Sequence, residues 1–87
     1  FLNEKMFETL LKVMLTDDVN IRLYVVKIFN ILFERAKKNG EETITECITM
    51  FDLYDGCEIL CNCKDTTEDE DLARNCVLFL DQYFPLE

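Results

Sequence analysis

Glycine and proline are almost missing from this chain. Among its 87 residues, only Gly40, Gly56 and Pro85 belong to these two types. Hairpins and tight loops depend on Gly and Pro to reach their backbone angles, so this chain has few places to turn sharply. About half of the residues (49%) are apolar, which is enough to build a core. The sequence therefore favours one compact all-α unit.

Apolar residues recur at helical spacing and predict five helices. The predicted segments run from Asn3 to about Leu15, from the polar break at 16–18 to about Lys38, from Thr43 to about Asp55, from Cys57 to Lys64, and from Thr67 onward. Two of them open on a capping box, Thr43-x-x-Glu46 and Thr67-x-x-Glu70. In the second segment, apolar residues such as Ile21 and Ile28 cover most of the circumference, which predicts a helix packed on several sides.

The last segment is strongly amphipathic. Its apolar residues gather on one broad face, and the opposite arc carries Asp71, Arg74, Asn75, Asp81 and Gln82. Leu78 lies in the middle of this polar arc, where a groove contact with a partner is expected.

Negative charge is concentrated in the second half of the chain. Residues 1–40 hold seven Lys/Arg against five Asp/Glu, whereas residues 41–87 hold two against thirteen. Such a field favours basic protein segments as partners and disfavours nucleic acid and anionic membranes. The run Glu68 to Asp71 is expected to face Lys or Arg of a partner and to speed association.

Cysteine and histidine usage argues against an enzyme or a metal protein. The chain has five Cys and no His, and CEILCNC matches no common disulfide framework or zinc motif. We expect reduced, buried thiols, no metal and no cofactor. Because no apolar run reaches the length of a membrane span and the first residues do not resemble a signal peptide, we expect a soluble intracellular protein. Without His or a Gly-rich loop, no catalytic constellation is visible, and we expect no enzyme activity.

The sequence also contains an internal repeat. Ile59, Leu60 and Cys63 follow Leu10, Leu11 and Met14 at an offset of 49, and the apolar residues of the last segment follow those of the second at an offset of 51. This pattern is typical of armadillo and HEAT solenoids. It predicts the terminus of an armadillo-like α-solenoid with about one and two-thirds repeats: the last two helices of a penultimate repeat in 1–40, and a complete C-terminal repeat in 41–87.

Three segments carry a resemblance to a family. In order, MFETLLKVMLTDDVNIRLYVVKIFNILFERAKK, ECITMFDLYDGCEIL and EDEDLARNCVLFLDQYF resemble the C-terminal armadillo repeats of importin-α. The resemblance implies a protein-binding module of a nuclear import adaptor that shuttles between nucleus and cytoplasm. Its implied partners are a β-karyopherin export receptor with Ran in its GTP form, a nucleoporin, and basic peptide segments.

The chain departs from the family at the cargo-binding ladder. The family reads basic signals with Trp and Asn on the third helix of inner repeats, but this chain has no Trp. The aligned ladder positions hold Lys27, Ile31, Leu78 and Gln82, and a shift of one residue would bring in Asn30. We therefore expect no cargo groove. The expected protein-binding residues are Glu68, Asp69, Asp71, Arg74, Leu78, Asp81 and Gln82.

Two alternatives to the importin-like interpretation stay open. The chain could be an unrelated helical-repeat fragment, or a self-standing bundle whose cysteines bind metal or sense redox. The solenoid interpretation also predicts self-association through an uncovered N-terminal end, because a repeat buries its apolar face only by stacking. The residues expected there are Phe1, Leu2, Met6, Phe7 and Leu10.

Overall fold

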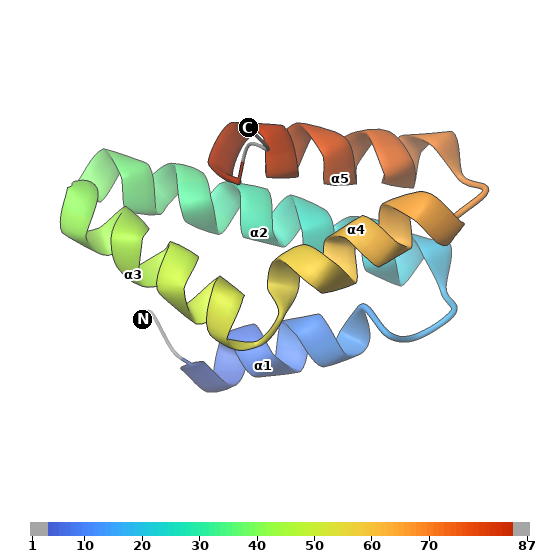
Figure 1. The fold of residues 1–87 in the computed structure, drawn as a ribbon, viewed down its shortest axis with the longest axis horizontal. Helices are drawn as coiled ribbons and strands as arrows, with labels where there is room; N and C mark the ends of the chain where they lie inside the picture. Colours follow the sequence, from blue (N-terminus) through green and yellow to red (C-terminus); the bar gives the residue numbers. More distant parts are fainter. Residues whose placement is uncertain (1–3, 85–87) are drawn as a thin grey trace.

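The computed structural model describes residues 4–84, which form five α-helices joined by short turns (Figure 1). The helices are α1 (Glu4–Val13), α2 (Val19–Asn39), α3 (Glu41–Leu53), α4 (Gly56–Thr66) and α5 (Glu70–Tyr83). The prediction of an all-α chain with five helices is therefore confirmed for these residues. The finer prediction of a solenoid end and its repeat boundaries at 1–40 and 41–87 stays a prediction.

The longest helix, α2, lies at the centre of the molecule. It packs against α1, α3 and α5, while α4 joins the group through α3 and α5 (Figure 1). The chain runs out along α1 and back along α2, then out along α3 and α4 and back along α5. The result is a flattened body measuring 36 × 29 × 19 Å along its principal axes.

Aromatic rings from both halves of the chain form one core. Phe29 and Phe33 on α2 meet Phe51 on α3 and Phe79 on α5, with ring centroids 5.1 Å apart for Phe29 and Phe51 and 4.9 Å for Phe33 and Phe79. Both pairs pack edge to face, the arrangement that aromatic quadrupoles favour. All four side chains are almost fully buried. The two predicted repeats thus share a single core.

Two helices begin at aspartate caps. The Asp18 carboxylate accepts a hydrogen bond from the Ile21 backbone N–H (3.1 Å), and that of Asp69 accepts one from Leu72 (2.8 Å). The capping box predicted at Thr67 is therefore wrong in register, because Asp69 holds the cap and the Thr67 hydroxyl accepts from the Asp69 N–H instead. Asp and Asn are the stronger N-cap residues, which explains the choice.

The capping box predicted at Thr43 is also wrong. Helix α3 begins two residues earlier, at Glu41, and no side chain caps it. Gly40 precedes it with φ of 127°, a backbone conformation that residues with a Cβ rarely adopt. This glycine turns the chain so tightly that α3 starts almost directly after α2 ends at Asn39.

The predicted exposure of the N-terminal end is only partly met. The prediction is wrong for Phe7. Its ring is fully buried, with its centroid 5.6 Å from that of Phe29, because α1 packs on both α2 and α3. Met6 and Leu10 are half-buried against the core. Phe1 and Leu2 lie outside the described residues.

The prediction that α2 is packed on several sides is confirmed, because α1, α3 and α5 all contact it. One face nevertheless stays open. Ile21 and Ile28 are 42% and 40% exposed. The three neighbours of α2 cover the sides that carry Val26, Phe29 and Phe33 and leave this face open.

Candidate protein-binding groove

A groove of about 430 Å³ runs between α2 and α5. Three of the predicted binding residues, Leu78, Asp81 and Gln82, line it from α5. Among the described residues, its lining is Val26, Asn30, Asn75, Leu78, Phe79, Asp81 and Gln82. The fold thus joins the outer arc of α5 to a part of α2 that is about fifty residues earlier in the sequence.

The groove has an apolar base and polar walls. Val26 and Phe79 are almost fully buried and form the base, while Leu78 stands 60% exposed beside them. The Asn75 amide donates a hydrogen bond to the Asp71 carbonyl oxygen (2.7 Å), which fixes its orientation. The Asp81 side chain is exposed to solvent and supplies negative charge along one wall.

The other four predicted residues lie outside the groove, toward the start of α5. Asp69 is occupied as the helix cap, and Glu68 is exposed in the turn before it. Asp71 and Arg74 form an ion pair of 3.5 Å with both side chains largely exposed (71% and 65%). Because exposed pairs add little stability, both side chains can exchange this contact for one with a partner.

Sequence reasoning missed half of the groove. Asn75 lies on the predicted polar arc but is not among the expected binding residues, and Val26 and Phe79 are apolar residues that periodicity alone assigns to the core. On α2, the ladder positions Lys27 and Ile31 do not line the groove, whereas Asn30, one residue from Ile31, does. The sequence pattern of α2 leaves open a shift of one residue, because only the packing of α2 against α5 decides which α2 side chains line the groove.

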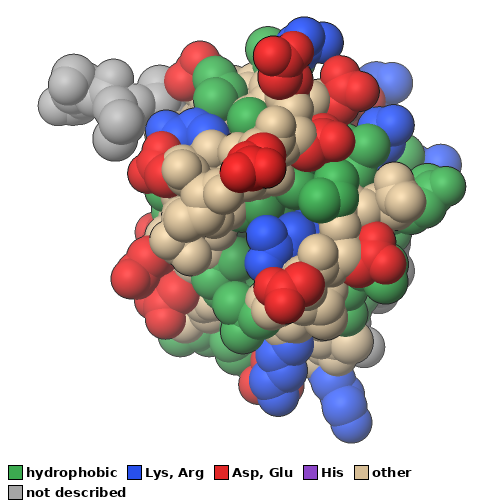
Figure 2. All heavy atoms as spheres, turned by 90° about the vertical axis from the view of Figure 1, so that its right-hand side faces the viewer, with side chains coloured by type: hydrophobic (Ala, Val, Ile, Leu, Met, Phe, Trp, Pro, Cys, Tyr) green, Lys and Arg blue, Asp and Glu red, His purple; other side chains and the backbone are tan. Residues whose placement is uncertain are grey.

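A second hollow, of about 660 Å³, surrounds Arg22 between the α1–α2 turn and α4. Its walls include Asp55, Glu58 and Asp65, and Figure 2 shows basic side chains ringed by acidic ones on this end of the molecule. Arg22 Nη1 lies 4.0 Å from Cys63 Sγ, and its buried Nε has no hydrogen-bond partner among the described residues. This hollow combines one guanidinium with a strongly acidic surrounding.

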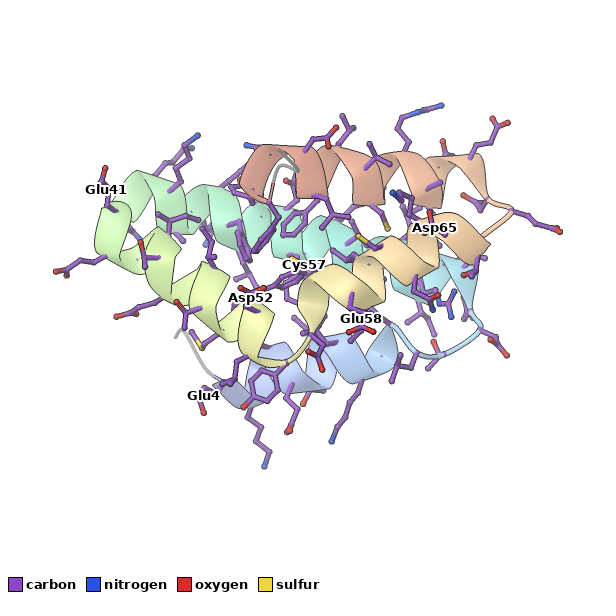
Figure 3. All side chains as sticks on the ribbon, in the orientation of Figure 1. Glu4, Glu41, Asp52, Cys57, Glu58 and Asp65 are labelled. Carbon is purple, nitrogen blue, oxygen red and sulfur yellow. The ribbon has the colours of Figure 1, made fainter. Side chains whose placement is uncertain are left out.

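The thiols of Cys57 and Cys76 are held in their protonated form. Burial, followed by the neighbouring Cys63, raises the pKa of Cys76 to about 12, and the Arg22 guanidinium opposes this only weakly. Burial and then Asp52 raise the pKa of Cys57 to about 11; its thiol lies 3.8 Å from the Asp52 carboxylate at the α3–α4 junction (Figure 3). Thiols with such pKa values are poor nucleophiles at neutral pH.

Metal-binding geometry is absent from residues 4–84: no three of their Cys, Asp and Glu side chains are grouped to hold an ion. Within the same residues, no helix is both long enough and apolar enough to cross a membrane. Comparisons with protein-family models, with curated proteins and with solved structures gave no match. The geometry of the groove is therefore the main indication of function.

Proposed function

We propose that this chain is a non-enzymatic protein-binding module whose α2–α5 groove holds an extended basic segment of a partner. The observation that carries the proposal is the convergence of Leu78, Asp81 and Gln82 with Asn30 on one groove. These residues combine an apolar contact, a negative charge and side-chain amides within reach of a single bound strand.

Each lining residue has a matching feature in a basic peptide. The amides of Asn30 and Gln82 offer both a donor and an acceptor, as a peptide backbone requires. Leu78 and the apolar base accept the aliphatic stem of Lys or Arg, whose charged end then reaches Asp81. The acidic residues at the start of α5, Glu68 and Asp71, add attraction during approach rather than contacts in the groove.

The resemblance to importin-α supports a particular set of partners. In this proposal the chain is the end of an armadillo-like solenoid in a nuclear transport adaptor that moves between nucleus and cytoplasm. Its ligands are then a β-karyopherin export receptor with Ran in its GTP form, a nucleoporin, or basic segments of either. The strong negative charge of residues 41–87, two basic against thirteen acidic side chains, agrees with ligands of this kind.

A peptide titration tests the groove. We expect a labelled peptide with two Lys-Arg pairs to bind, as measured by fluorescence anisotropy, and a matched Glu-Asp peptide not to bind. Leu78→Ala should weaken binding about fivefold, since about 1 kcal/mol of apolar contact is lost. Val77→Ala is the control, because Val77 is on the same helix and 37% exposed but does not line the groove.

Charge variants distinguish contacts inside the groove from the attraction that Glu68 and Asp71 exert on an approaching partner. Asp81→Asn should speed dissociation, whereas Glu68→Lys with Asp71→Lys should slow association and flatten its dependence on salt. Equal binding of the acidic peptide, or equal effects of Leu78→Ala and Val77→Ala, would contradict the groove. Binding of the export receptor that ignores all these variants would place its contact elsewhere on the chain.

A further inference from the structure

The side of α2 that faces away from its neighbours carries four exposed, large apolar side chains. Ile21, Tyr24, Ile28 and Ile31 are 42%, 67%, 40% and 53% exposed. At 100° per residue they share an arc of about 80° on the helix, opposite its buried face. In Figure 1, α4 passes in front of α2 and no helix is drawn behind it. We call these four residues the α2 stripe. A continuous stripe, unlike scattered apolar residues, marks an interaction surface.

We infer that the α2 stripe pairs with the α2 stripe of a second copy, the two helices lying antiparallel about a two-fold axis. The stripe residues are separated by three, four and three positions. This spacing is unchanged when the helix is reversed, so one register matches the whole stripe with itself. In that register Ile21 faces Ile31 of the second copy, and Tyr24 faces Ile28. Every large apolar side chain then meets another, as a self-complementary interface requires.

Charge at the two ends of α2 fits the same register. Asp17 and Asp18 precede the helix, whereas Arg35, Lys37 and Lys38 lie in its last turns. Antiparallel pairing brings the acidic end of each copy to the basic end of the other, and the register set by the stripe places Arg35 beside the turn that holds Asp17 of the second copy. Both side chains are exposed. Arg35 continues the line of the stripe at 100° per residue, and Asp17 lies in the turn directly before the helix. The opposed helix dipoles add to the attraction.

The position of the stripe also reduces repulsion between copies. The chain carries a net charge of −9, and thirteen of its eighteen acidic residues are in 41–87. Helix α2 belongs to the half in which Lys and Arg outnumber Asp and Glu, so two copies approach there against the weakest field. One contact opposes pairing: Lys27 flanks the stripe beside its midpoint, where it meets Lys27 of the second copy.

The dimer should be weak. A standard interface buries about 800 Å² on each partner, and one face of a single helix supplies less than this, so we expect a micromolar dissociation constant.

Sedimentation velocity at chain concentrations from about 5 to 500 μM covers this range of dissociation constants. We expect a monomer–dimer equilibrium that Ile28→Glu weakens at least about tenfold, because it buries a charge in the interface.

Leu53→Glu is the matched control. Leu53 is 62% exposed on α3, away from the stripe, so the same change of charge and size should leave dimerisation unaltered. Circular dichroism of each variant verifies that the helices remain folded. Leu78→Ala, the groove variant, should also leave the dimer unaltered, which separates this inference from the proposed function.

The register is tested by exchanging charges. Asp17→Arg and Arg35→Asp should each weaken the dimer several-fold, and mixing the two variants should restore it, because each then offers the charge that the other lacks. Lys27→Gln should strengthen it. A monomer at all concentrations, assembly beyond the dimer, or equal effects of Ile28→Glu and Leu53→Glu would overturn the inference. A stripe-dependent dimer that the mixture does not restore would overturn the antiparallel register.

Discussion

At the scale of single residues, Gly56 lies where α3 meets α4, against the ring of Phe51. A Cβ built on Gly56 would lie 2.5 Å from two carbons of that ring, closer than real Cβ contacts. The ring is fully buried between Phe29, Phe33, Phe79 and Phe84 and has no room to move. The α3–α4 turn therefore requires a residue without a side chain at this position.

We expect Gly56→Ala to destabilise the fold by about 1–3 kcal/mol, the usual cost of overpacking a core. The measurement is urea denaturation followed by circular dichroism. In a Phe51→Leu background, the smaller side chain relieves the contact, so the same substitution should cost clearly less. Additive losses in the double variant would show that the contact with Phe51 is not the cause.

At the scale of elements, the start of α5 depends on a single carboxylate. Asp69 Oδ1 accepts a hydrogen bond from the Leu72 N–H. In the preceding turn, the Thr67 hydroxyl accepts a hydrogen bond from the Asp69 N–H. Because α5 supplies Leu78, Asp81 and Gln82 to the groove, the cap also fixes where these side chains stand along α2.

Asp69→Ala should therefore cost about 1 kcal/mol of unfolding free energy, as loss of an N-cap does, while Asp69→Asn should retain most of it. Thr67→Ala should cost less than Asp69→Ala. Chemical denaturation of the three variants checks this order. If Thr67→Ala were the more damaging change, the capping box read from the sequence would be correct after all.

At the scale of the whole molecule, the two halves of the chain hold one core. Rings from 1–40, Phe29 and Phe33, contact rings from 41–87, Phe51 and Phe79. Neither half can retain its packing when the other unfolds, because the faces that these rings cover would become exposed to water. The protein should therefore unfold as one unit, even though its sequence contains a repeat.

We expect a single urea transition, with circular dichroism and tyrosine fluorescence giving coincident curves. Phe33→Ala should lower stability by about 3–5 kcal/mol and move both curves together. The third tyrosine, Tyr24, lies in the first half, so the comparison is made in a Tyr24→Phe background, where the signal comes from Tyr54 and Tyr83 in the second half. A tyrosine transition that did not follow Phe33→Ala would disprove a shared core.

Much of the fold is contained in local patterns of the sequence. Periodic apolar residues and the scarcity of Gly and Pro predict five helices, and the observed bounds agree closely for α1 and α2. The starts of α3 and α5 differ by two or three residues from the predicted ones, since several residues near each turn are able to cap a helix. Three of the five residues that α5 contributes to the groove were equally predictable, because the 100° spacing places Leu78, Asp81 and Gln82 on one arc.

What the sequence by itself determined is therefore which residues share a face of a helix. Which face meets which neighbour was decided only by the tertiary structure. Helix α2 is apolar around most of its circumference, so periodicity cannot say that Phe29 and Phe33 enter the core, that Asn30 enters the groove and that Ile28 stays exposed. The physical reason is that the helical period fixes angles within a helix, whereas contacts between helices depend on how all five pack around one shared volume.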